Sequence, residues 1–309
     1  MQARPIIGTH FDQRNSRWSH RTSVRSTPFC SPSDTVGDAT HILEDWSRQM
    51  TYETIKVRNE GAAAVLVLNR PERRNAISTR LMGELIEALG AAERDPAIRA
   101  VIVTGGPTYF AAGADLNEAL QVQTAAQGMA YFKQWHRLNQ CIEELDKPVI
   151  AAIEGFCITG GLELALACDL RVAGEGATFA VTSSKIGTVA GAGGTQRLPR
   201  IVGVSNALEL LFSADPIDAK EAHRIGLINR LVKQGEALAT ATAMVKVYEE
   251  RAPLSLALVK RAVHRGMQMD LASAIDFETF LVTTIYGTED KREGISAFLE
   301  KRTARFKGK

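Results

Sequence analysis

The chain has 309 residues, of which 45% are hydrophobic and 23% are charged, and its formal net charge is +2. This length and composition are typical of a soluble globular protein with one large domain or two small ones. The small net charge gives no electrostatic reason to expect a nucleic-acid partner. No apolar run in the sequence reaches the roughly 18 residues that suggest a membrane span, so no membrane contact is expected.

The first 49 residues differ in composition from the rest of the chain. Residues 1–33 contain five arginines, one aspartate and no lysine, and they lack hydrophobic periodicity, so we expect disorder here. This composition also fits an organelle transit peptide, which would make the protein mitochondrial. We favour a dispensable extension that results from an upstream start codon, because a well-patterned strand follows Met50 at once. The protein would then be bacterial and cytoplasmic.

Strands and helices alternate in the predicted core, residues 50–203. Such β-α-β units predict an α/β fold with right-handed crossovers. The predicted strands are Thr54–Val57, Ala64–Asn69, Ala100–Thr104, Pro148–Ile153 and a strand near Leu170–Ala173, and the predicted helices are Thr79–Arg94, Met129–Leu145 and a helix that starts at Gly161.

The pattern becomes helical after about residue 204. We therefore predict a helical C-terminal region, residues 204–309, that forms a second subdomain or an oligomer interface and closes the pocket. The predicted helices are 205–213, 218–225, 236–251, 254–266, 270–286 and 288–300.

Metal and disulfide chemistry have little support in the sequence. The four cysteines form no Cys-x-x-Cys pair, and the six histidines show no His-Glu-x-x-His spacing. We therefore expect reduced thiols and no bound metal. The nucleophile motif Gly-x-Ser-x-Gly is also missing from the sequence.

Glu163 is the most informative residue of the chain, because it lies among leucines in a predicted buried helix. A buried carboxylate must be paired, protonated or functional, since burying an isolated charge is costly. Gly160 and Gly161 open the same helix, where backbone N–H groups lack partners and attract negative charge. Free N–H groups and a carboxylate within one turn suit chemistry on a carbonyl compound.

Several segments together resemble the crotonase superfamily of enoyl-CoA hydratases and isomerases. They are Asn69–Ser78 (NRPERRNAIS), Tyr109–Leu116 (YFAAGADL), Gly155–Asp169 and Gly191–Pro199 (GAGGTQRLP), in an order and spacing similar to the family's. The resemblance extends from about Met50 to Lys307. It implies repeated β-β-α units in a spiral core, trimers that pair into hexamers, and an acyl-CoA thioester as substrate. Coenzyme A is then part of the substrate, and no separate cofactor is expected.

The resemblance also assigns roles to individual residues. In this family two backbone N–H groups hold the thioester oxygen, and the matching groups belong to Ala114 and Gly160. Glu163 matches the first of two glutamates that position and activate water in the hydratases, although a structural ion pair is an alternative. Gly191–Gly194 is expected to form a loop close to the acyl pocket. The other predicted substrate contacts are Ala76, Ala112, Gly113, Asp115, Leu116 and Gly161, and for Asp115 we favour a helix N-cap.

The second family glutamate is missing from this chain. The family hydratases have the pattern F-x-x-P-E-x-x-x-G, and the corresponding segment here runs from Phe179 to Gly187 without a gap. Ser183 then occupies the position of the second glutamate, and Thr182 that of the proline. A serine cannot deliver a proton at neutral pH as a carboxyl group can. The site therefore has less acid–base capacity than a two-glutamate hydratase, or it performs different chemistry.

Contacts with coenzyme A are predicted from weaker matches. The lysine of the family's A-D-x-K segment is Asn117 here, so Arg73 and Arg74 are proposed to replace its phosphate contact. The C-terminal segment Phe298–Lys301 matches a family segment that reaches toward coenzyme A from a neighbouring subunit, although Lys301 equally fits a plain surface charge.

These observations favour an enoyl-CoA hydratase that uses an oxyanion hole and one glutamate. The alternatives within the fold are an isomerase, a hydrolase, a decarboxylase or a carbon–carbon lyase acting on a CoA ester. A different class of alternative is a catalytically weak protein that binds RNA or acyl-CoA. The helix Thr79–Arg94 offers no basic stripe for RNA, because its acidic residues offset its arginines.

Overall fold

The structure is a computed structural model that describes residues 51–309. The predictions made for residues 1–49 lie outside the described residues. The strands are β1 (Ile55–Glu60), β2 (Ala63–Leu68), β3 (Ala100–Thr104), β4 (Val149–Ile153), β5 (Phe156–Ile158), β6 (Leu170–Gly174), β7 (Thr178–Ala180), β8 (Ile217–Asp218) and β9 (Arg230–Val232). The helices are α2 (Thr79–Arg94), α3 (Leu116–Leu120), α4 (Ala125–Glu144), α5 (Gly160–Ala167), α6 (Gly194–Val202), α7 (Val204–Ser213), α8 (Ala219–Arg224), α9 (Ala237–Glu249), α10 (Pro253–Gly266), α11 (Leu271–Ile285) and α12 (Glu289–Leu299), with short 3-10 helices η1 (Pro71–Arg73) and η2 (Ser183–Ile186).

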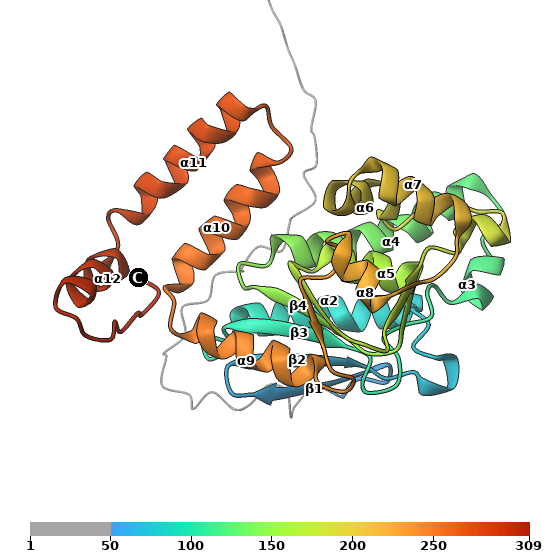
Figure 1. The fold of residues 1–309 in the computed structure, drawn as a ribbon, viewed down its shortest axis with the longest axis horizontal. Helices are drawn as coiled ribbons and strands as arrows, with labels where there is room; N and C mark the ends of the chain where they lie inside the picture. The colour runs from blue at the N-terminus through green and yellow to red at the C-terminus, as the bar shows by residue number, and fades with distance from the viewer. Residues whose placement is uncertain (1–50) are drawn as a thin grey trace, which may run out of the picture. The chain divides into compact units, whose positions relative to one another are not determined.

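Two sheets organise the described part of the chain. The larger sheet, seen in Figure 1, has the order β1-β2-β3-β4-β6-β9, in which β1 and β2 are antiparallel and the other neighbours are parallel. The smaller sheet has the order β5-β7-β8, in which β5 and β7 are parallel and β8 is antiparallel. Parallel strands connected through helices confirm the predicted α/β fold.

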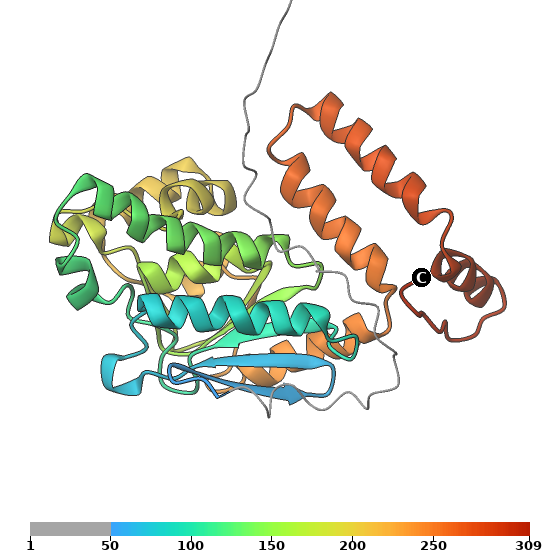
Figure 2. The ribbon, with the colours of Figure 1, turned by 180° about the vertical axis from the view of Figure 1, so that it is seen from behind.

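The larger sheet is buried on both faces, as near-continuous apolar strands require. Side chains alternate between the faces along a strand, so Val101 and Val103 of β3 join the core that includes α2, α4 and α5. Ile102 instead packs in a second core with α9. Figure 1 and Figure 2 show α2 and α9 on opposite sides of this sheet. The sheet is thus a rigid base for the segments that follow its strands.

Most long elements match their predictions, and the differences have local causes. The helix Thr79–Arg94 and the strand Ala100–Thr104 have the predicted bounds. The helix predicted at Met129–Leu145 begins at Ala125 instead, because Thr124 and Gln127 form a capping box one turn earlier. Hydrophobic periodicity does not predict β5, β7, β8 and β9, because two or three residues are too few to show a period.

The C-terminal region supplies helices and also strands to both sheets. The six helices predicted after residue 204 are present as α7 to α12, while β8 joins the smaller sheet and β9 the larger one. Lys260 ties α10 to the sheet region: its Nζ lies 2.9 Å from Asp169 Oδ2 and donates to the Ile142 carbonyl at 2.8 Å. The helices α10 to α12 expose many apolar side chains, including Val259, Val263, Phe280, Ile295 and Phe298. Within residues 51–309, no helix is both long and apolar enough to cross a membrane.

Candidate active site

A cavity of about 370 Å³ lies beside the first turn of α5. The segments that follow β2, β3, β5 and β7 line it, together with one face of α4 and the loop before α6. Ligand sites of α/β proteins commonly form in this way, at the carboxyl ends of strands. Nine predicted site residues line the cavity with Glu163, and they are Arg73, Ala76, Ala112, Gly113, Ala114, Asp115, Leu116, Gly160 and Ser183.

The backbone amides of Ala114 and Gly160 lie close together at this cavity. A Cβ atom placed on Gly160 would be 3.0 Å from the Ala114 nitrogen and 2.8 Å from the Trp135 ring, so only glycine fits here. Gly113 has a φ of +116°, which favours glycine, and Ile77 N donates to its carbonyl at 2.8 Å. Among the described residues, neither the Ala114 amide nor the Gly160 amide has a hydrogen-bond acceptor. The cavity therefore has two adjacent free N–H donors.

Thr159 bends the chain sharply between β5 and α5. Its φ of +43° is a strained conformation for a β-branched residue. Hydrogen bonds hold it there: Thr159 N donates to the Ala180 carbonyl at 2.8 Å, and Thr182 N donates to Thr159 Oγ1 at 2.9 Å. The two threonine hydroxyls also lie 2.9 Å apart. This bend brings the first amide of α5 to the cavity directly after a strand.

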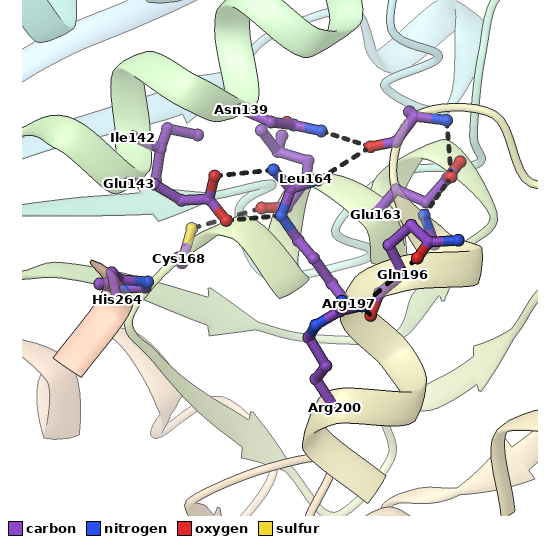
Figure 3. Close-up of polar contacts among 12 residues, drawn as sticks. Asn139, Ile142, Glu143, Glu163, Leu164, Cys168, Gln196, Arg197, Arg200 and His264 are labelled. Carbon is purple, nitrogen blue, oxygen red and sulfur yellow. Dashed lines mark hydrogen bonds and ion pairs between the residues drawn. The ribbon is translucent and has the colours of Figure 1, made fainter. Parts of the chain in front are cut away.

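Glu163 lies one turn into α5 and is 3% exposed. Its Oε1 accepts hydrogen bonds from the Ala192 and Gly194 amides, each at 2.8 Å (Figure 3). Its Oε2 has no partner within residues 51–309. Burial raises the pKa of this carboxyl group above its ordinary value, while the two amides and the charge of Arg197 limit the rise. The residue thus presents one anchored oxygen and one available oxygen at the cavity.

Asp115 is the second carboxylate that lines the cavity, but both of its oxygens are engaged. Oδ1 accepts from the Asn117 amide at 3.0 Å, and Oδ2 pairs with Arg70 Nη2 at 2.9 Å. Burial alone would raise the pKa of Asp115, but these hydrogen bonds lower it below its ordinary value. Asp115 is the N-cap of α3, as the sequence predicts. Glu163 is therefore the cavity carboxylate with an oxygen to spare.

Ser183 begins η2 and is buried at the cavity, where the sequence register places it. Its hydroxyl has no hydrogen-bond partner among the described residues. Lys185, two residues further on, is exposed and pairs with Asp215 at 2.8 Å. The η2 segment therefore brings a neutral hydroxyl to the cavity and no acid or base.

Four predicted substrate contacts do not line the cavity. Gly161 is buried where a Cβ atom would lie 2.7 Å from the Ala111 carbonyl oxygen, so it serves close packing. Arg74 is exposed, and its carbonyl accepts from the Ala112 amide at 3.1 Å. Phe298 is 84% exposed near the end of α12, and Lys301 is exposed just after that helix. Within this chain these four residues are separate from the cavity.

Three aromatic side chains of α4 line the cavity and were missed by the sequence analysis. They are Tyr131, Phe132 and Trp135. The Phe132 ring lies so close to the loop before α6 that a Cβ atom on Gly191 would be 2.3 Å from it. The signal in the sequence was the spacing of Tyr131 and Trp135, which places both on one helix face. These rings form an aromatic wall of the cavity that carries no charged group.

Comparisons with known proteins find similar sequences and similar folds. A family model described as enoyl-CoA hydratase/isomerase matches residues 58–309. The short-chain-enoyl-CoA hydratase of Clostridium acetobutylicum is 38% identical over 254 residues, which cover 82% of this chain and 97% of the relative. The crotonyl-CoA hydratase of Syntrophomonas wolfei is 40% identical over 83% of this chain and 99% of its own length. A crystal structure of enoyl-CoA hydratase from Bacillus anthracis has a TM-score of 0.79 and 35% identity, with 83% of this chain and all of that chain covered.

Proposed function

Because the chain belongs to the enoyl-CoA hydratase/isomerase family, we propose that it is a hydratase that adds water to the double bond of a trans-2-enoyl-CoA thioester. The observation that carries this proposal is the presence in one cavity of two free amides and one buried carboxylate with a free oxygen. The relatives named above are themselves described as hydratases. They favour hydration over the other reactions of the fold.

The two amides would act on the carbonyl end of the substrate. In the proposed complex, Ala114 N–H and Gly160 N–H donate to the thioester oxygen. Negative charge develops on that oxygen as water adds to C3, and fixed backbone donors stabilise it without reorganisation. The two amides would thus form an oxyanion hole, and the loss of one donor of this kind typically costs about 100-fold or more in rate.

Glu163 would carry out both proton transfers. Its Oε2 takes a proton from water while the water oxygen bonds to C3, and the π electrons of the double bond move into an enolate. The protonated carboxyl group then returns the proton to C2 as the thioester carbonyl re-forms. One water molecule is added in total, and Glu163 ends as the carboxylate. Ser183 would hold the water molecule, because its hydroxyl can donate a hydrogen bond to the water oxygen. The neutral hydroxyl would transfer no proton.

Isomerisation is the second candidate, because it needs only one carboxylate. The available oxygen of Glu163 is the single free carboxylate oxygen that the described residues bring to the cavity. A lone base can remove a proton from one carbon of an enoyl thioester and return it to another, so the missing second glutamate favours this reaction as much as hydration.

The proposal extends to the coenzyme A end and to assembly. Arg73 lines the cavity and is exposed, which suits a phosphate contact. We propose a homotrimer or hexamer, supported by the apolar side chains exposed on α10 to α12. Sedimentation of the purified chain tests the assembly, and a monomer at all concentrations would contradict it.

A spectroscopic assay tests the reaction itself. Hydration removes the conjugation of crotonyl-CoA, so its ultraviolet absorbance falls in proportion to turnover. We expect such a fall, with a 3-hydroxyacyl-CoA as the product in mass spectrometry. If the absorbance stays constant while a 3-enoyl-CoA gains conjugation, the protein is an isomerase, and the hydratase proposal fails.

A further inference from the structure

Ala192 is held in the wall of the cavity by hydrogen bonds to both of its backbone polar groups. Its N–H group donates to Glu163 Oε1 at 2.8 Å, and the Ala192 carbonyl accepts from Asn139 Nδ2 at 2.6 Å (Figure 3). Arg197 Nη1 donates to the same carbonyl at a longer distance, 3.3 Å, while its other nitrogens pair with Glu143 at 2.6 and 2.7 Å. Two hydrogen bonds, joined through the backbone of Ala192, thus connect Asn139 on α4 with Glu163 on α5.

Asn139 has features that a purely structural residue would not need. It is completely buried, and its side-chain oxygen has no hydrogen-bond partner within the described residues. An unpartnered buried carbonyl is costly. A leucine has the same number and branching of side-chain heavy atoms and would avoid this cost, and the Ala192 carbonyl would still have Arg197 as a donor. The amide therefore serves something other than stability.

We infer that Asn139 is a positioning residue for the reaction proposed above, because its hydrogen bond to the carbonyl fixes the backbone of Ala192, so that the Ala192 N–H holds Glu163 Oε1 and leaves Oε2 available at the cavity. The inference rests on the proposed function, which gives Oε2 its task. A base must be held within hydrogen-bond reach of the proton it removes, and small misplacements cost up to about 100-fold in rate.

The charged groups around Glu163 determine how the loss of Asn139 changes the protonation of this carboxylate. Arg197 on α6 is the cation that faces the carboxylate, and Glu143 on α4 is paired with that arginine. The Tyr131 hydroxyl on α4 also interacts electrostatically with Glu163, and burial raises the pKa of this phenol. Without Asn139, the amide of Ala192 holds the anionic carboxylate less firmly, so the neutral form of Glu163 is favoured.

The variants Asn139→Leu and Asn139→Ala test the inference on the full chain. We expect kcat for crotonyl-CoA to fall about 10- to 100-fold while KM changes little, and the acidic limb of the pH–rate profile to move to higher pH. The melting temperature of the leucine variant should stay close to that of the unchanged protein. The matched control is Asn206→Leu, because Asn206 Nδ2 also donates to a carbonyl, that of Val202 at 2.8 Å, but away from Glu163. We expect this control to retain its activity.

A carbon-13 titration of the Glu163 carboxyl group, assigned through Glu163→Gln, separates this inference from the proposed function. If the unchanged protein hydrates nothing, the proposed function fails, yet the titration still reports whether Asn139→Leu raises the pKa of Glu163. The alanine variant gives the same readout if the leucine variant does not fold. Unchanged kcat and an unchanged titration in a folded Asn139 variant would overturn the inference.

Discussion

The cavity has two walls that differ in how firmly their groups are held. The α5 wall, defined by Gly160, Glu163 and Ala192, is buried, and hydrogen bonds fix the carboxylate and the loop beside it. The η2 wall, defined by Ser183, Ile186 and Val189, brings one neutral hydroxyl, and its two apolar side chains are 59% and 70% exposed. Groups that must meet a developing charge need fixed positions. The η2 wall supplies no ionisable group, and Ser183 stands there at the position where the sequence register predicts the family's second glutamate.

The largest expected effect comes from disturbing the α5 wall. Gly160→Ala places a Cβ atom 3.0 Å from the Ala114 nitrogen and 2.8 Å from the Trp135 ring. The two amides must then move apart, and we expect kcat for an enoyl-CoA to fall about 100-fold or more. Steady-state kinetics on the folded variant measure this. Activity within a fewfold of the unchanged protein would remove the two amides from the mechanism.

Ser183→Glu adds an ionisable carboxyl group to the η2 wall. A second carboxylate near Glu163 holds a proton more readily, because two like charges cannot both ionise easily. It can then protonate C2 of the substrate while Glu163 activates water. We expect hydration to become about tenfold or more faster and its pH–rate profile to become bell-shaped. Ser183→Gln is the matched control, since it has similar size without an ionisable group, and an equal gain with glutamine would contradict this explanation.

A smaller effect concerns the stability cost of the α5 wall. Burial raises the pKa of Glu163 in the folded protein above the value of 4.5 that applies to the unfolded chain. At pH values between these two pKa values, the carboxyl group is protonated in the folded protein and ionised in the unfolded chain. As pH rises above the pKa of the unfolded chain, the penalty for the buried charge grows, and it is complete above the raised pKa. We therefore expect Glu163→Gln to unfold at higher denaturant concentration than the unchanged protein at neutral pH.

Chemical denaturation at several pH values measures this difference. It should shrink as the pH falls and disappear below about pH 4, where both states of the unchanged protein are protonated. A glutamine variant that is less stable at neutral pH would show that Glu163 contributes to folding rather than burdening it.

The sequence was sufficient to predict the parts of the site that lie close together along the chain. Gly160 and Glu163 belong to one helix start, and the helix pattern predicted both the helix and the burial of the carboxylate. Ser183 followed from an ungapped register between Phe179 and Gly187. Among the long elements, Thr79–Arg94 was predictable to the residue because its apolar positions repeat over several turns.

The contacts between distant segments were not predictable. The amides that hold Glu163 belong to Ala192 and Gly194, which follow it by 29 and 31 residues. A loop near the pocket was expected, but no local pattern indicates which backbone N–H meets a carboxylate. Asn139 is even more distant in sequence, because it precedes Ala192 by 53 residues. A polar residue in a helix also usually indicates an exposed position, so its burial was not expected. Such contacts depend on tertiary packing alone.

The most direct test of the contrast between the walls compares Glu163→Gln and Ser183→Ala in one assay. The measurement is kcat for crotonyl-CoA, from the decay of its ultraviolet absorbance. We predict a loss of about 100-fold or more for Glu163→Gln and a loss of less than about tenfold for Ser183→Ala, which removes one hydrogen bond to water. A loss for Ser183→Ala as large as that for Glu163→Gln would contradict the assignment of all proton transfer to the α5 wall.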